Sequence, residues 1–219
     1  MTQYDLLLWV AVAAVLAILP TVFLLRRRHE KAMRRLADRL GMKYLGKAFE
    51  PESHSVRRFD LFRRGSRSEV TNAMTNRIGD VDVILFEYRY YTHGRRAKEA
   101  AGQTVVILHC RKHRLPRFML RPIHLGHQLA RMFGDNDIGF DCDPAFARRY
   151  HVSGQNREEI LDAFHMGARQ FLRDLDKPAY VEGIGSWLLY YRRNRCLSPP
   201  KAKALLNEAI ELSSHLSVR

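Results

Sequence analysis

The pentapeptide HCRKH brings together three possible metal ligands or nucleophiles, His109, Cys110 and His113. In an extended strand His109 and Cys110 point to opposite faces, and the two histidines lie about 13 Å apart. Zinc needs four protein ligands, or three and a water, and this stretch supplies too few. We interpret it as the end of a β-strand with Cys110 buried as a small apolar residue, and we expect no metal or other cofactor.

A second candidate is the acidic stretch GDNDIGFDCDP, in which four carboxylates could ligate a hard cation: Asp135, Asp137, Asp141 and Asp143. An EF-hand loop would need a further oxygen ligand at Gly139 and a glutamate at Phe146, and neither is present. Alternatively, these aspartates cap backbone N–H groups around a short strand, or pair with Arg148 and Arg149.

The nearest residue to a general base is Glu182, which stands beside glycines in VEGIG that could let a ligand approach. A glutamate in such a setting more often pairs with an arginine. The sequence contains no G-x-S-x-G elbow, no Walker A loop and no H-E-x-x-H motif. It therefore assigns no catalytic residue.

The N-terminal segment indicates whether the protein is attached to a membrane. From Leu6 to Leu25, twenty residues run without a charge, and a helix of that length spans about 30 Å, the thickness of a bilayer's hydrocarbon core. A cleaved signal peptide has a basic start and a small-residue cleavage site, whereas MTQYD holds an acid and no base. We predict a transmembrane signal anchor over residues 1–25.

Bases follow the apolar run directly, in a helical neck predicted over residues 26–41. Because Lys and Arg beside a membrane span stay in the cytoplasm, we predict a single-pass inner-membrane protein. Its N-terminus lies outside and residues 42–219 form one cytoplasmic domain. The bases expected to contact anionic headgroups lie in the neck and in a basic loop: Arg26, Arg27, Arg28, Lys31, Arg34, Arg35, Arg95 and Arg96.

The charge of the chain suits a membrane surface. It is +14, from 37 Lys and Arg against 23 Asp and Glu, and an anionic leaflet attracts nearby bases by about 1 kcal/mol each. We do not expect nucleic acid as a partner, because we find no nucleic-acid-binding module and no stacking aromatics beside the bases. Three cysteines without paired spacing are typical of a reducing compartment.

The remaining pattern predicts an α+β domain with a mainly antiparallel sheet and several packed helices. The clearest strand, Val81–Thr92, alternates so that one face carries Ile84, Phe86, Tyr88 and Tyr90. Residues 103–112 form its expected neighbour. We also predict strands over residues 57–65, 69–80 and 180–193, and helices over residues 156–175 and 198–216.

Several phrases, in order along the chain, resemble a widespread group of bacterial single-span membrane proteins of unknown function: FDLFRRG, FEYRYYT, QTVV, LPRFMLRP, DIGFDCDPAFARRY and EGIGSWLLYYR. The similarity runs from Gly41 to Arg192, and the group's usual form has an aspartate where this chain has Glu87. The resemblance implies a bacterial source and an inner-membrane location, and it offers no catalytic residue.

The leading hypothesis is a non-enzymatic, membrane-anchored cytoplasmic binding or scaffold module that contacts the lipid bilayer and a membrane-protein partner. The alternative is a membrane-tethered enzyme or small-ligand binder with a site near residues 135–143 and Glu182. The first predicts an exposed apolar patch or groove. The second predicts a pocket in which titratable groups converge with perturbed pKa values.

Overall fold

The computed structural model describes residues 3–50, 55–93, 98–112, 114–123 and 137–216. Within these ranges the helices are α1 (Gln3–Arg39), α2 (Pro144–Arg149), α3 (Arg157–Ala163), α4 (Met166–Asp174) and α5 (Pro199–His215), with the short 3-10 helices η2 (Ser55–Arg58) and η3 (Asp60–Arg63). The strands are β1 (Lys43–Gly46), β2 (Ser66–Ile78), β3 (Val81–His93), β4 (Lys98–Cys110), β5 (Leu115–Pro122), β6 (Tyr150–Gly154), β7 (Tyr180–Gly185) and β8 (Trp187–Tyr191).

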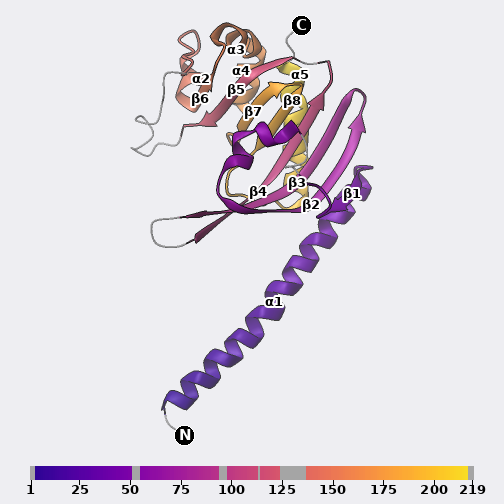
Figure 1. Ribbon diagram of the computed structural model, residues 1–219, viewed down its shortest axis with the longest axis vertical. Helices are drawn as coiled ribbons and strands as arrows, with labels where there is room; N and C mark the ends of the chain where they lie inside the picture. Colours follow the sequence, from indigo (N-terminus) through magenta and orange to yellow (C-terminus); the bar gives the residue numbers. More distant parts are fainter. Residues whose placement is uncertain (1–2, 51–54, 94–97, 113, 124–136, 217–219) are drawn as a thin grey trace.

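One eight-stranded sheet organises the molecule, in the order β1-β2-β3-β4-β8-β7-β5-β6. Every neighbouring pair is antiparallel, which confirms the predicted α+β class with an antiparallel sheet. The C-terminal hairpin β7–β8 inserts between β4 and β5, so segments far apart in sequence meet at the centre (Figure 1).

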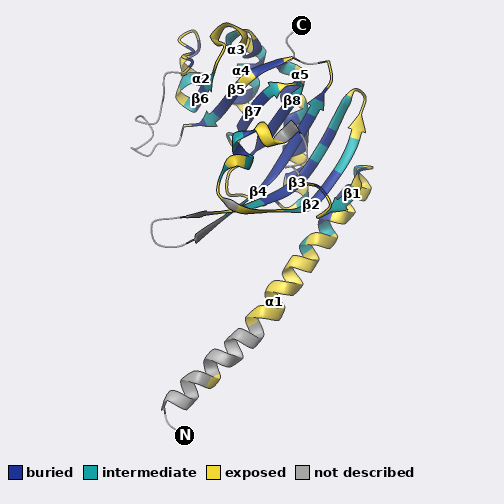
Figure 2. Cartoon of the chain, in the orientation of Figure 1, coloured by how far each residue is buried: buried dark blue, intermediate teal, exposed yellow. Residues whose placement is uncertain are grey.

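The central strands of the sheet are buried on both faces, whereas β2 is partly exposed (Figure 2). One face packs against the end of α1 and against α2–α5, in a core that includes Leu85, Val106 and Leu212. The opposite face is rich in aromatic side chains, and the segment that holds η2 and η3 covers it through Phe59 and Leu61. Polar groups on either face are therefore removed from water and need partners inside the protein.

The alternation predicted for β3 is confirmed. Phe86, Tyr88 and Tyr90 belong to the aromatic face, whereas Leu85 and Glu87 lie on the helix-covered face. All thirteen residues of β3 pair in register with β4. This uninterrupted ladder is the rigid platform to which α1 and the C-terminal elements attach.

Three predicted elements differ from the structure. Residues 57–65 were expected to form a strand, but they lie mainly in η2 and η3. The helix expected over residues 156–175 is broken, because Phe164 leaves the helical conformation and His165 caps α4. The strand expected over residues 180–193 is a hairpin, in which Gly185 with φ +59° makes the turn into β8.

The first helix continues without a break from Gln3 into the domain (Figure 1). It ends at Arg39, and Gly41 with φ +62° turns the chain into β1. Among the residues whose side chains are described, no helix holds a stretch long and apolar enough to cross a membrane. The side chains of residues 1–17 apart from Trp9, which make up most of the predicted anchor, lie outside the described part of the chain.

Candidate functional site

A buried carboxylate, that of Glu87, joins the sheet to α1. Glu87 in β3 is 1% exposed, and its Oε1 accepts a hydrogen bond from His29 Nε2 at 2.6 Å. The hydrogen bond to Glu87 raises the pKa of His29. Burial works to raise the pKa of Glu87, yet the His29 contact and the Asn72 hydrogen bond outweigh it, so that this pKa is lowered. Both shifts favour the charged form of the pair.

A bulge in β2 completes this network. The register with β3 shifts between Thr71 and Met74, and Asn72 there adopts φ +53°, a conformation that asparagine tolerates better than most residues. The bulge turns Asn72 onto Glu87, to which it donates at 2.9 Å, while it accepts from the Tyr44 hydroxyl at 2.8 Å. The network thus ties α1, β1, β2 and β3 together.

The predicted basic neck surrounds this junction. The six neck bases named above are exposed on α1, whereas Met33, Leu36 and Ala37 on the same helix are buried in the domain core. Arg34 also lies over the ring of Tyr44, with its guanidinium carbon 4.9 Å from the centroid. Arg95 and Arg96, the other predicted headgroup contacts, lie outside the described residues.

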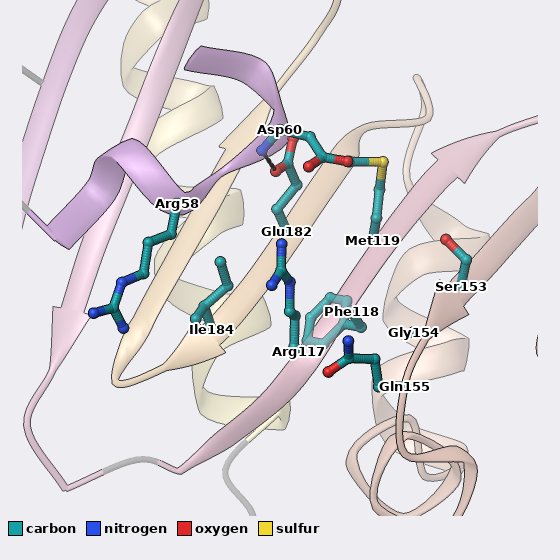
Figure 3. A pocket seen from close by; sticks show the side chains of 10 residues that line it. All are labelled: Arg58, Asp60, Arg117, Phe118, Met119, Ser153, Gly154, Gln155, Glu182 and Ile184. Carbon is teal, nitrogen blue, oxygen red and sulfur yellow. Dashed lines mark hydrogen bonds between the residues drawn. The ribbon is translucent and has the colours of Figure 1, made fainter. Parts of the chain in front are cut away.

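A separate cavity of about 260 Å³ surrounds Glu182 on the aromatic side of the sheet (Figure 3). Its walls come from η2 and η3, β5, β6 and the turn after β6, and β7; they include Arg58, Arg117 and Gln155. Figure 3 shows the side chain of Arg117 extending toward Glu182. These neighbours come from distant parts of the chain and have no local signature in the sequence.

Glu182 is 3% exposed and is held by neutral donors. Its carboxylate accepts from the backbone N–H of Asp60 at 2.7 Å and from the Tyr191 hydroxyl at 3.4 Å. Burial raises the pKa of Glu182 to about 7, although the Asp60 N–H and the charge of Arg64 favour the ionised form. The expected arginine ion pair does not form among the described residues. Glu182 is instead a carboxyl that can gain or lose a proton near neutral pH.

The glycines of VEGIG serve packing and chain reversal, not ligand approach. A Cβ at Gly183 would overlap the ring of Phe118 from β5, and Gly185 makes the β7–β8 turn. The absence of a side chain at Gly183 is therefore what lets β5 and β7 pair at this point.

The acidic stretch does not converge on Glu182. Asp143 caps α2 by accepting from the Phe146 N–H at 3.1 Å, and it pairs with Arg169 and Arg173 at 3.1 and 3.2 Å. Asp137 lies 2.9 Å from His151. These contacts match the capping and pairing interpretation, although the arginine partners differ from those expected. Asp135 lies outside the described residues, within which no cluster of three metal-ligating side chains occurs.

The HCRKH stretch is the end of β4, as predicted. Cys110 is buried against α5, and His109 points to the other face, where its ring stacks on Trp187 at 4.0 Å and lies 3.3 Å from Asp82. His113 lies outside the described residues.

The fold defines a mixed α+β protein built on one antiparallel sheet. No family model matches the chain, and no curated protein does. Among solved structures it is similar to the crystal structure of the mycobacterial trehalose monomycolate transport factor A, TtfA. The TM-score is 0.55 and the sequence identity 14%, over 86% of this chain and 92% of that chain. At this identity the similarity establishes a shared fold.

Proposed function

We propose that this chain is a non-enzymatic, membrane-anchored cytoplasmic module that acts as an accessory factor in the transport of a membrane lipid. The observation that carries the proposal is the continuity of α1. One helix begins in the apolar segment, carries six exposed bases, and ends with three residues in the domain core. The domain is therefore fixed to the helix and not suspended on a linker.

The spacing along α1 supports a position at the headgroup layer. Leu25 ends the apolar segment, and Met33 is the first buried residue of the domain core. The seven residues between them rise about 10 Å in a helix. The headgroup region of one leaflet is about 5–8 Å thick, so the base of the domain would lie against lipid headgroups with the neck bases among them.

The structural neighbour supports the transport part of the proposal. TtfA is described as a transport factor for trehalose monomycolate. A factor of this kind need not perform chemistry, which agrees with a chain in which sequence analysis assigns no catalytic residue. On this basis we propose that the domain holds a transport protein, or its lipid cargo, at the cytoplasmic surface.

The test is crosslinking in native membranes, followed by affinity purification of the tagged full-length chain at high salt. High salt screens indiscriminate binding to a chain of charge +14. We expect one stoichiometric membrane-protein partner. A matched variant would place a flexible Gly-Ser insert between Arg28 and His29, and we expect it to remain in the membrane but to lose the partner. Recovery of the chain alone, or equal capture by the insert variant, would contradict the proposal.

The Glu182 cavity supports a second candidate, a membrane-tethered small-ligand binder or enzyme. The specific observation is a buried carboxyl with its pKa raised to about 7 inside a cavity of about 260 Å³. A ligand screen by thermal denaturation tests it. A true ligand would stabilise the native chain but not the Glu182→Gln variant, whereas stabilisation of both would place the ligand elsewhere.

A further inference from the structure

A second, strongly basic cavity of about 540 Å³ lies at the first turn of α5. Its walls come from the loop after α4, the loop after β8, and α5 itself; they include Lys177, Arg195 and Lys201. Within the described part of the chain these three side chains make no ion pair. Arg192 is already bound, with its guanidinium 2.7 Å from Glu208. Among the described residues that line the cavity, Asp176 is the one acid besides Glu208. The lining therefore carries more positive than negative charge.

Hydrogen bonds fix the loops that form the walls of the cavity. Arg192 bridges Glu208 and the backbone oxygen of Lys177, which joins the two loops. On the other side Arg195 O accepts from the Thr104 N–H at 2.9 Å, and Leu197 N–H donates to the Thr104 hydroxyl at 2.8 Å. The loop that carries Arg195 is therefore fixed to β4 at both ends of its turn.

These same contacts link the cavity to α1 through the sheet. Thr104 pairs directly with Glu87, and Glu87 binds His29 of α1. His29 follows Leu25, the last apolar residue, by four positions, which is about 6 Å along a helix. Because one headgroup layer is about 5–8 Å thick, the proposed membrane attachment places His29 among lipid headgroups, and the cavity is connected to His29 through Thr104 and Glu87.

The helix layer places the opening of the cavity at the same end of the domain. α5 begins beside Thr104 and runs toward Cys110, beside which Ser213 lies near the end of the helix. Its first turn is therefore the part of α5 nearest the apolar half of α1, with the positive end of its dipole in that direction. The Ser198 hydroxyl makes no capping hydrogen bond there and adds a neutral donor.

We propose that this cavity binds the phosphate-bearing headgroup of an anionic phospholipid from the membrane in which α1 is anchored. Lys177, Arg195 and Lys201 supply the charge, and the Ser198 hydroxyl can donate to a phosphate oxygen or a headgroup hydroxyl. The inference deepens and rests on the proposed membrane attachment, because the predicted anchor is what holds the domain at the membrane surface.

The test uses the full-length protein in non-ionic detergent micelles, titrated with fluorescent phosphatidylglycerol. The Arg195→Gln/Lys201→Gln variant removes two bases at about 1 kcal/mol each, so we expect binding to weaken about 30-fold. The control, Arg114→Gln/Arg157→Gln, removes the same charge at exposed positions after β4 and at the start of α3, and we expect less than a threefold change. Thermal denaturation of each variant checks that the fold is retained.

Two outcomes would overturn the headgroup assignment. An equal loss in both variants would show diffuse attraction to charge, and displacement of the lipid by an equal concentration of inorganic phosphate would show a site for free phosphate. Neither outcome would contradict the proposed accessory role, because that role is tested separately by capture of a partner from membranes. Conversely, specific lipid binding without a partner would leave this site standing and remove the accessory role.

Discussion

The imidazole of His29 and the carboxylate of Glu87 lie 2.6 Å apart although they are 58 positions apart in the chain. One belongs to the basic part of α1 and the other to the β3–β4 ladder. This contact therefore fixes the helix against the sheet at the point where helix and domain meet.

Loss of this contact should destabilise the domain. Because Glu87 is 1% exposed, His29→Ala leaves a buried carboxylate with fewer partners, and we expect the free energy of unfolding to fall by about 1–3 kcal/mol. Urea denaturation of the full-length protein in micelles measures it. Lys47→Ala is the control, since it breaks an exposed pair with Glu69 and should cost less than about 1 kcal/mol. Equal effects would show that the buried pair has no special weight.

The same pair should give a pH-dependent effect. The pKa of His29 is raised above 6.5, so its contribution is complete below pH 6.5 and disappears as pH rises through the raised pKa. The pKa of Glu87 is lowered below 4.5, so its contribution is complete above pH 4.5 and disappears as pH falls through the lowered pKa. The destabilisation by His29→Ala should therefore be largest between about pH 4.5 and 6.5. A constant effect from pH 5 to 9 would contradict this.

Glu182 should make stability fall with rising pH in a different window. Its pKa is about 7 in the folded protein against an ordinary value of 4.5 for a glutamate in water, so the folded state holds more protons between these values. Stability should decline by about 3 kcal/mol across that window, and Glu182→Gln should remove the decline. Denaturation at pH 5 and pH 8 measures it, with Glu158→Gln, an exposed change on α3, as the control. An unchanged slope in Glu182→Gln would assign the pH dependence to other groups.

Gly183 should not accept even one methyl group. A Cβ there overlaps the Phe118 ring, and Phe118 is 3% exposed and cannot move into solvent. We expect Gly183→Ala to lower the free energy of unfolding by about 1–3 kcal/mol. Gly139→Ala is the matched control, because its Cβ would only touch Asp141 at an ordinary 3.7 Å. Equal denaturation midpoints for the two variants would refute the packing role.

The native cysteines can test the orientation in the membrane. Cys142 and Cys196 are exposed on the domain, and Cys110 is buried. If the domain is cytoplasmic, a membrane-impermeant maleimide should leave Cys142 and Cys196 unlabelled in intact bacterial spheroplasts and label them after permeabilisation. Labelling of these two cysteines in intact spheroplasts would show that the domain lies outside the cytoplasm, opposite to the predicted topology. A cysteine introduced at Gln3 is the internal control, because it should label from outside.

The sequence predicted those elements whose periodicity is strong and local. The faces of β3, the end of β4, and α5 with its buried Leu205, Ala209 and Leu212 were all confirmed. In each case a continuous apolar pattern of fixed period faces one core, so local sequence and tertiary packing agree.

Errors arose where tertiary packing overrides a local pattern. The sequence did not predict the tight turn at Gly185. Both β7 and β8 are largely buried and no polar loop separates them, so the two strands read as one apolar run. The helical period continues across Phe164, but packing of that ring against Phe118 accompanies a break in the helix. Local propensity carries no information about such contacts.

The candidate site was predicted less completely than the fold. Glu182 was recognised as unusual, but its actual donor, the Asp60 N–H, lies 122 residues away. Likewise nothing near Glu87 in the sequence indicates His29 as its partner. Buried polar networks assembled from distant segments have no periodic signature. The sequence can therefore indicate one residue of such a network but not the partners that it contacts.

The unbroken first helix has a mechanical consequence. A 37-residue helix is about 55 Å long, and its final turns are clamped by core packing and by the His29–Glu87 contact. Pro20 lies inside this helix and removes one backbone hydrogen bond, so a bend is expected there. The part of the helix after Pro20 holds no further proline and moves with the domain as one rigid body. A bilayer thinner than the apolar segment favours tilt. Under the proposed membrane attachment, the angle between the domain and the bilayer would therefore follow bilayer thickness, and a larger tilt would bring the basic neck closer to the headgroups.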